Sequence, residues 1–482
     1  MKSWNAILSI AAAALVLTLV PAPPLAAQEG EGCREVLIRV IDKIEQEYPG
    51  FEEKTADTLR YATFKKSVLE RAETTPDSRC LRVLRDYTGY FRDHHIYVAS
   101  AGAEDRDEDP VAYHTEKIDG PLDQIIARVS RSDDPLEGIW ETPGYEVGIT
   151  ARDDGGYAAF IIEADTAYWK PGEIKFRLYD DGRADYSMRD HSRVESTYTV
   201  HGGSVLEFED LSGRFIRTRP EPPLPEAEIE QKLNELDGLY FERLSDRTAL
   251  LRLARFAYSE VARIEALIDG NRDLLENHEN LVLDLRDNPG GTDDAYRLLL
   301  PYLYTNPIRV MGAEYKATPT LVNGLQEYMD GLPDTEEHDA DRERISGNIR
   351  TYKAHMGEFV GLDSTDVYVQ TMDPADPAPR QIVILANRGT ASAAEHLVYK
   401  ARQSRKVKIM GTPTAGVLDY GSSRWADIGT DRYRLSIPTF RSTRLPEYPI
   451  DNIGLQPDIY LDQSVEDWVE YAQDYMEHDR HD

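Results

Sequence analysis

Residues 281–291 read Leu-Val-Leu-Asp-Leu-Arg-Asp-Asn-Pro-Gly-Gly, and residues 382–395 read Ile-Val-Ile-Leu-Ala-Asn-Arg-Gly-Thr-Ala-Ser-Ala-Ala-Glu. Each stretch is a short apolar run that breaks into a glycine-containing turn and then continues into a helical pattern. Apolar runs without alternation are typical of strands that are buried on both faces of a sheet, as in α/β proteins. The two stretches therefore predict two inner strands of an α/β domain.

The turns that follow these strands carry the candidate chemistry. Gly290 and Gly291 allow backbone N–H groups to approach another group closely, because glycine has no Cβ. Ser392 follows the second turn at the start of a helical pattern. A donor-rich turn beside a helix-start serine suits acyl transfer, which needs an oxyanion site and a nucleophile. Two plainer interpretations remain open: a serine that only caps its helix, and a tight strand–helix turn.

The chain length, the net charge and the N-terminal residues limit which classes of protein are possible. A chain of 482 residues is expected to form two or three domains. The net charge of −32 disfavours nucleic acid and anionic lipid as partners. Residues 1–27 contain Lys2, an apolar stretch and a small-residue exit, which predicts a cleaved signal peptide and an exported protein, periplasmic or secreted. An uncleaved anchor is the alternative, and no other segment is long enough to span a membrane.

The chain contains two cysteines, Cys33 and Cys80. In an exported protein such a pair predicts one disulfide between neighbouring helices, and two unpaired thiols are the alternative. Two cysteines provide no zinc cluster, and we expect neither a metal nor an organic cofactor.

Composition and periodicity divide the mature chain into several parts. Residues 28–130 have helical spacing, and 131–218 have the alternation and Asp-Gly turns of a small antiparallel sheet or barrel. A Pro-rich linker leads to alternating strand and helix patterns over 226–462, which 305–380 interrupt with polar helical segments. Residues 463–482 form an acidic amphipathic helix. The predicted fold class is therefore multi-domain α/β.

Four segments in a fixed order resemble the C-terminal processing, or tail-specific, serine peptidases and their relatives around the tricorn protease core. They are the two stretches quoted above, Gly-Thr-Pro-Thr-Ala-Gly at 411–416 and Asn-Ile-Gly-Leu-Gln-Pro-Asp-Ile at 452–459. The resemblance covers about 226–462 and the short segment Asp93-His94-His95. It implies a crotonase/ClpP-like core of ββα units. It also implies Ser392 as the nucleophile, with Gly290, Gly291 and the N–H of Ala393 as oxyanion donors.

The sequence departs from the processing peptidases at the catalytic base. Those enzymes use a lysine 25 residues after the serine, and that position is Val417 here, which cannot accept a proton. The tricorn-like branch uses a histidine from an earlier part of the chain, which makes His95 the expected base and His94 the alternative. Histidine suits this role because its ordinary pKa lies near neutral.

The carboxylate that orients the base has two candidates. Relatives carry an acidic residue just ahead of the Gly-x-x-Pro-Asp segment, and Asp451 matches it. Glu395, one helical turn after Ser392, could instead brace the site.

The substrate-binding part also departs from the resemblance. The processing peptidases carry a PDZ domain that binds the substrate's C-terminus, whereas 131–218 lack a Gly-Leu-Gly-Phe-like loop. Selection of free C-termini is therefore not expected. The expected function is an exported serine peptidase that acts on peptides or proteins through an acyl-enzyme. The alternatives are a non-catalytic carrier of an apolar ligand on the same fold, and an esterase.

Overall fold

The computed structural model describes residues 32–101 and 116–478, apart from positions 167, 190, 210, 212, 363 and 364. The predicted signal peptide at 1–27 lies outside the described residues. Within the described ranges, no helix combines the length and the apolar character that a membrane span requires.

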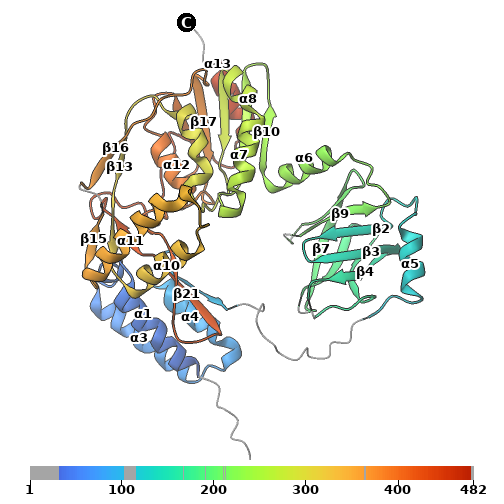
Figure 1. The fold of residues 1–482 in the computed structure, drawn as a ribbon, viewed down its shortest axis with the longest axis horizontal. Helices are drawn as coiled ribbons and strands as arrows, with labels where there is room; N and C mark the ends of the chain where they lie inside the picture. The colour runs from blue at the N-terminus through green and yellow to red at the C-terminus, as the bar shows by residue number, and fades with distance from the viewer. Residues whose placement is uncertain are drawn as a thin grey trace, which may run out of the picture.

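A six-stranded sheet forms the centre of the α/β part (Figure 1). Its strands, in spatial order, are β10 (Leu239–Arg243), β11 (Thr248–Leu253), β12 (Asn280–Asp284), β17 (Gln381–Ala386), β18 (Val407–Gly411) and β23 (Ile459–Tyr460). β10 runs antiparallel to β11, and every other neighbouring pair is parallel. The two quoted apolar runs are β12 and β17, adjacent inner strands of this sheet, so the prediction of an α/β fold is confirmed.

Helices on both faces explain why these strands do not alternate between apolar and polar residues. Leu281 and Leu283 of β12 join one core with α7 (Val261–Gly270), α8 (Arg272–Asn277), η3 (Asp293–Leu299), α9 (Leu300–Leu303) and α12 (Ala393–Ala401). Val282, which points the other way, joins a second core with Ala472 and Met476 of α13 (Trp468–His478). Successive side chains of a strand face opposite sides, so both faces must be apolar here.

The insertion at 305–380 contains strands as well as the predicted helices. Its helices are α10 (Pro319–Gly331) and α11 (Asp339–Ala354), and its strands are β13 (Ile308–Met311), β14 (Ala313–Lys316), β15 (Phe359–Gly361) and β16 (Val367–Gln370). β14 lies between β15 and β22 (Phe440–Ser442), which in turn pairs with β19 (Tyr420–Gly421). Pairing with a distant segment explains why four-residue runs form strands that local periodicity does not indicate.

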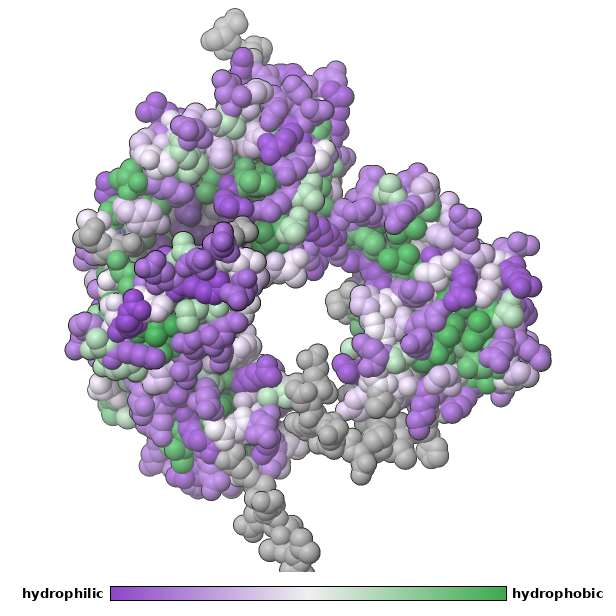
Figure 2. Space-filling model, viewed as in Figure 1, coloured by the Kyte–Doolittle hydropathy of each residue, from purple (hydrophilic) through white to green (hydrophobic). Residues whose placement is uncertain are grey.

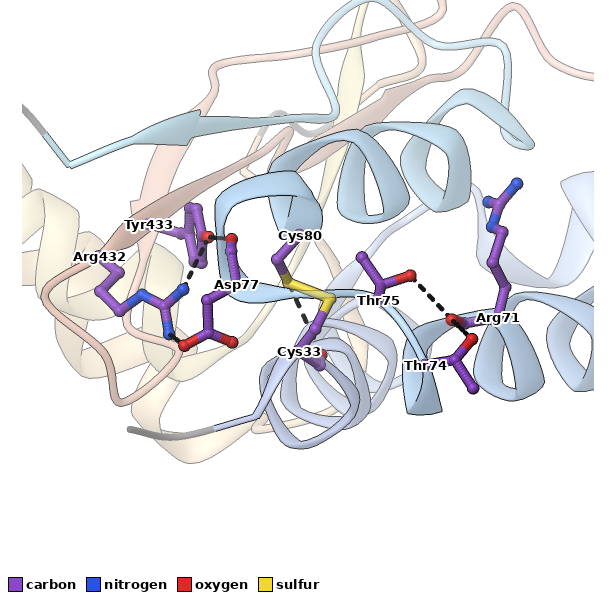
Figure 3. Close-up of a disulfide and its surroundings, with 8 residues drawn as sticks. All are labelled: Cys33, Arg71, Thr74, Thr75, Asp77, Cys80, Arg432 and Tyr433. Atoms are coloured by element: carbon purple, nitrogen blue, oxygen red, sulfur yellow. Dashed lines mark hydrogen bonds and ion pairs between the residues drawn. A yellow bond between two sulfur atoms is a disulfide. The ribbon is translucent and has the colours of Figure 1, made fainter. Parts of the chain in front are cut away.

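The N-terminal region is a helical layer packed on the α/β part. It comprises α1 (Cys33–Glu47), α2 (Phe51–Lys54), α3 (Thr58–Glu73) and α4 (Cys80–Gly89). Figure 3 shows the disulfide that joins Cys33 to Cys80, with a Cα–Cα distance of 5.3 Å. β1 (Tyr97–Ser100) then pairs with β21 (Tyr433–Ile437), which also pairs with β20 (Arg424–Ala426). This pairing attaches an early segment of the chain to a late one.

The β-rich module is a closed barrel of eight antiparallel strands, in which β9 pairs back with β2. The strands are β2 (Gly138–Thr142), β3 (Tyr145–Ala151), β4 (Tyr157–Ala164), β5 (Ile174–Leu178), β6 (Arg183–Ser187), β7 (Arg193–His201), β8 (Val205–Phe208) and β9 (Arg214–Arg219). α6 (Glu226–Asp237) follows the barrel and leads to β10, and the barrel lies to one side of the α/β part (Figure 1). Figure 2 shows that hydrophilic residues cover most of the visible face of both parts.

The last helix before residue 130 contacts the barrel. α5 (Leu122–Val129) packs on β2 and β3 of the barrel rather than on the N-terminal helices. Arg128 of α5 donates to Glu137 at 2.8 Å and so ties the helix to the barrel. Helical periodicity alone could not assign α5 to either neighbour, because it indicates an apolar face and not its partner.

Candidate active site

The two turns after β12 and β17 are joined by reciprocal hydrogen bonds. Because the strands are parallel neighbours, both turns emerge at the same edge of the sheet. The Asp287 N–H donates to Asn387 Oδ1, and Asn387 Nδ2 donates to Asp287 Oδ1, both at 2.9 Å. The Ala391 N–H donates to the Asn288 carbonyl at 2.9 Å. The glycine turn and the serine turn therefore form one connected unit.

Ser392 has an unusual backbone conformation at the N-cap of α12. Its φ is 50° and its ψ is −119°, a region that residues other than glycine rarely adopt. Gly290 lies directly against it with φ +88°. A Cβ at position 290 would come within 2.6 Å of the Ala391 carbonyl oxygen, 2.7 Å of the Ala393 nitrogen and 2.9 Å of Ser392 Cβ. The Pro-Gly-Gly turn thus supplies the close approach that the sequence predicted.

The three predicted oxyanion donors differ in what their N–H groups do. The Gly290 N–H donates to Asn288 Oδ1 at 2.8 Å, so it is occupied and the role of Gly290 here is steric. Within the described part of the chain, the N–H groups of Gly291 and Ala393 have no hydrogen-bond acceptor. Ala393 is the first residue of α12, where a helix leaves N–H groups without internal partners. These two donors can therefore receive an oxygen atom from a ligand.

Glu395 connects Ser392 to the loop that contains Val417. Its fully buried carboxylate accepts from the Ser392 N–H at 3.2 Å and from the N–H groups of Gly416 and Val417, each at 2.8 Å. Burial raises the pKa of Glu395, although these hydrogen bonds oppose the rise. The Val417 side chain is buried, so an apolar group occupies the position of the expected lysine.

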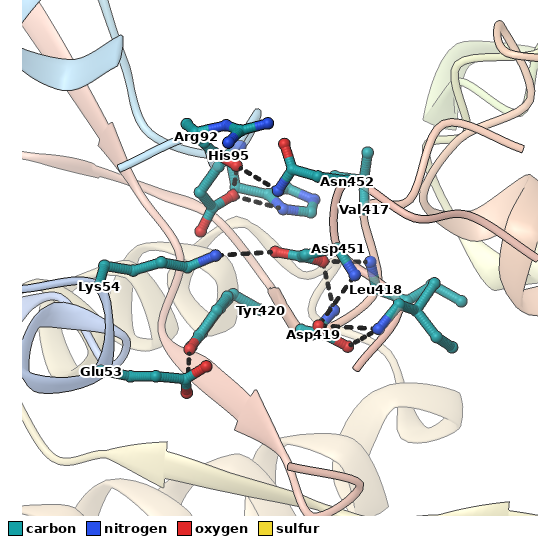
Figure 4. Close-up of polar contacts among 12 residues, drawn as sticks. Glu53, Lys54, Arg92, His95, Val417, Leu418, Asp419, Tyr420, Asp451 and Asn452 are labelled. Atoms are coloured by element: carbon teal, nitrogen blue, oxygen red, sulfur yellow. Dashed lines mark hydrogen bonds and ion pairs between the residues drawn. The ribbon is translucent and has the colours of Figure 1, made fainter. Parts of the chain in front are cut away.

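Asn452 fastens the segment that carries His95 to the same loop (Figure 4). Asn452 Nδ2 donates to the Arg92 carbonyl, and the Asn452 N–H donates to the Gly416 carbonyl, both at 2.9 Å. Glu395 also binds Gly416, so hydrogen bonds lead continuously from the early histidine segment to Ser392. His95 is largely buried at this junction, with 16% of its side chain exposed, whereas His94 is exposed.

The carboxylate that contacts His95 belongs to Asp93. His95 Nδ1 lies 3.3 Å from Asp93 Oδ1, an ion-pair distance without the alignment of a hydrogen bond, and the His95 N–H donates to the same oxygen at 2.8 Å. Tyr48 donates its hydroxyl to Asp93 Oδ2 at 2.9 Å. Burial lowers the pKa of His95. The contact with Asp93 and the negative charges of Asp93, Asp451 and Glu395 outweigh burial, so the pKa of His95 is raised above 6.5.

Asp451 lies near His95 but makes different contacts. Its Oδ1 accepts from the N–H groups of Leu418 at 3.0 Å and Asp419 at 2.8 Å, and its Oδ2 lies 3.8 Å from Lys54 Nζ (Figure 4). Burial, followed by the charges of Asp93 and Asp419, raises the pKa of Asp451 to about 7. No hydrogen bond joins Asp451 to His95 within the described ranges. Sequence reasoning missed Asp93 as the contacting carboxylate, although it stands only two residues before His95.

Comparison with known proteins identifies the part of the chain that contains Ser392. Residues 247–461 match the sequence model of Peptidase family S41. No curated protein matches the chain. Among solved structures, mature CPAF is 14% identical with a TM-score of 0.48, over 93% of this chain and 98% of that one. The D1 C-terminal processing protease of photosystem II is 13% identical with a TM-score of 0.36, over 90% and 92%. A putative peptidase from Parabacteroides merdae is 12% identical with a TM-score of 0.41, over 91% and 93%. Residues 247–461 therefore belong to peptidase family S41, and the chain contains a serine-type peptidase domain.

Proposed function

We propose that this chain is an exported serine peptidase in which Ser392 attacks the peptide carbonyl and His95 is the base. The observation that carries the proposal is the strained turn at Ser392, held against Gly290 and flanked by unpaired N–H groups. A residue other than glycine with such a φ persists only where its surroundings enforce it, and such residues cluster at functional sites. A serine that only caps a helix has the ordinary extended conformation of an N-cap and needs no such strain.

The proton transfer begins at the Ser392 hydroxyl. Neutral His95 accepts that proton as the hydroxyl oxygen bonds to the carbonyl carbon, and the imidazolium then donates it to the leaving amine. A water molecule hydrolyses the resulting ester by the same route. The N–H groups of Gly291 and Ala393 stabilise the negative oxygen in both steps.

The carboxylates around His95 stabilise its protonated form. Asp93 contacts the ring and Tyr48 holds Asp93 in place, so we assign the orienting role to Asp93. Asp451, the carboxylate expected from the family resemblance, adds its charge to this effect only at a pH where it is ionised, because its own pKa is raised to about 7. A protonated imidazole that is stabilised in this way makes His95 a stronger base for the serine proton.

Export accounts for the disulfide and the predicted signal peptide together. A disulfide between Cys33 and Cys80 persists in an oxidising compartment, such as the periplasm or the exterior of the cell. The substrates are peptides or proteins that reach the same compartment.

Hydrolysis of a fluorogenic peptide library by the full mature chain tests the proposal. Wild type and His94→Gln should hydrolyse the same peptides, whereas Ser392→Ala and His95→Gln should lose at least about a hundredfold in kcat/KM. His94 is the matched control because it is the exposed neighbour of the proposed base. Undiminished hydrolysis in Ser392→Ala would exclude the proposed nucleophile. Hydrolysis of simple esters without any peptide cleavage would instead indicate an esterase.

A further inference from the structure

A cavity of about 600 Å³ is lined by residues close in sequence to the glycine turn and by residues of α10, α11 and β20. Tyr258 and Asp294 are among its lining residues. Tyr258 lies two residues after Phe256, whose carbonyl packs against Gly291. Asp294 lies three residues after Gly291. Two of the lining residues thus come from segments next to the glycine turn, and most of the others belong to α10 and α11 of the insertion.

The cavity combines apolar walls with one incompletely paired cation, Arg424 of β20. Arg424 Nη1 donates to the Ser423 carbonyl at 3.0 Å, and its Nε is buried without a hydrogen-bond partner. The carboxylates of Asp294 and Glu327 line the same cavity, but neither lies within ion-pair distance of Arg424, and no other carboxylate of the described chain does.

The residues around Arg424 are closely packed and include buried polar groups without partners, as expected of a binding site. Gly324 of α10 lies so close that a Cβ there would come within 2.5 Å of Arg424 Cδ, so the helix has room for the arginine only because it has a glycine. Ser422, which also lines the cavity, has φ 53°. The hydroxyl of Ser423 is buried without a hydrogen-bond partner. Unsatisfied buried donors are costly, and a ligand that accepts hydrogen bonds offsets that cost.

We propose that this cavity is a substrate subsite in which Arg424 binds a carboxylate of the peptide, next to an apolar side chain. The proposal rests on the proposed peptidase function and extends it to the substrate class. An arginine fork suits a carboxylate because it can donate two parallel hydrogen bonds. The apolar neighbour would contact the tyrosine and leucine side chains that form the walls, among them Tyr352, Leu321 and Leu325.

A second cavity shares part of its lining with the first. This cavity has a volume of about 330 Å³ and shares Tyr315 and Leu362 with the first. His396, one helical turn after Ser392, and Leu418, next to Val417, line it. Each cavity thus has lining residues that are near neighbours in sequence of the glycine turn, Ser392 or Val417, and we infer that an extended peptide bound across both cavities passes Ser392. The carboxylate is either an acidic side chain or the free C-terminus of the peptide.

The test compares matched pairs of fluorogenic peptides with the full mature chain. In one set each residue in turn is Glu or Gln, and in the other the C-terminus is an acid or an amide. Wild type should favour the carboxylate member of one set by about tenfold in kcat/KM, the size expected for one charge-assisted hydrogen-bonded contact. The set that shows the preference identifies the source of the carboxylate.

Arg424→Gln should abolish that preference while it retains kcat/KM for the neutral peptides, and Arg424→Lys should retain part of it. Arg344→Gln is the matched control, because Arg344 lines the same cavity but is paired with Asp341 at 2.8 Å. An equal preference in Arg424→Gln, or no preference in wild type, would overturn the subsite.

A measurement of peptide binding distinguishes a failure of the subsite proposal from a failure of the peptidase proposal. Fluorescence anisotropy of the same labelled peptides with Ser392→Ala measures their binding to the cavity, because this variant should not hydrolyse them. If wild type hydrolyses nothing but Ser392→Ala binds the carboxylate peptide tenfold more tightly, the subsite stands and the catalytic assignment fails. If hydrolysis depends on Ser392 but the paired peptides bind equally well, the subsite fails and the catalytic assignment stands.

Discussion

Replacement of Asp451 by Asn should change how the stability of the chain depends on pH. In the native fold, burial and the charges of Asp93 and Asp419 raise the pKa of Asp451 from 3.8 to about 7. Folding therefore favours the protonated carboxyl, and its stabilising effect is complete below about pH 4 and is lost as the pH rises through 7. An asparagine is neutral throughout, and its Oδ1 can still accept from the N–H groups of Leu418 and Asp419.

The size of the effect follows from the shift. A rise of about three units, at 1.36 kcal/mol per unit, corresponds to about 4 kcal/mol. The free energy of unfolding of Asp451→Asn relative to wild type should therefore increase by up to about 4 kcal/mol between pH 4 and pH 8. For a unit of 150 to 250 residues, that difference corresponds to a relative rise in Tm of about 8 to 16 °C.

Differential scanning calorimetry of both proteins at intervals from pH 4 to pH 8 measures this difference. Asp246→Asn is the control, because its side chain is 97% exposed and its replacement should leave the difference flat. A stability difference for Asp451→Asn that stays constant or falls with pH would refute the reasoning. That result would mean that Asp451 is ionised in the fold at neutral pH and that a cation compensates its charge.

Three further predictions concern the site and the disulfide. Gly290→Ala places a Cβ within 2.7 Å of two backbone atoms beside Ser392 and should lower kcat/KM by at least about a hundredfold in a peptide assay; near-wild-type activity would argue against the close approach. Asp93→Asn removes an interaction that raises the pKa of His95, so the rising limb of kcat/KM against pH should move to lower pH, with activity reduced; an unmoved limb would count against Asp93. Cys80→Ser opens a loop of 47 residues and should lower the free energy of unfolding by about 4 kcal/mol in urea titrations, whereas no change would show that the N-terminal layer does not depend on the bond.

The sequence predicted the central sheet because a single physical pattern determines it. Residues 281–283 and 382–386 are apolar on both faces. The glycine turn after the first run allows a close approach that a Cβ would block. Those features are local, so they can be recognised without a structure. The β-rich module was also recognisable from its alternation and turns, but the closure of the eight-stranded barrel depends on the β2–β9 pairing, which no local pattern encodes.

The surroundings of the proposed base were harder to predict because they come from distant parts of the chain. The sequence suggested His95 through a resemblance in three residues. The segment that carries His95 is held by a hydrogen bond from Asn452, 357 positions later, to the Arg92 carbonyl. Asp93 contacts the ring because of a tight local turn, whereas Asp451, expected on family grounds, is held by the backbone of Leu418 and Asp419. Arg424 had no sequence signal, because its lack of a carboxylate partner is a property of the folded cavity.

Intact-protein and peptide mass spectrometry after reaction with a fluorophosphonate tests the proposed chemistry most directly. The reagent forms a stable bond with a serine that a neighbouring base activates. The account predicts a single adduct on the peptide that contains Ser392, its absence in Ser392→Ala, and its slow formation in His95→Gln but not in His94→Gln. An adduct on another residue, or equal labelling of His95→Gln and wild type, would contradict the account.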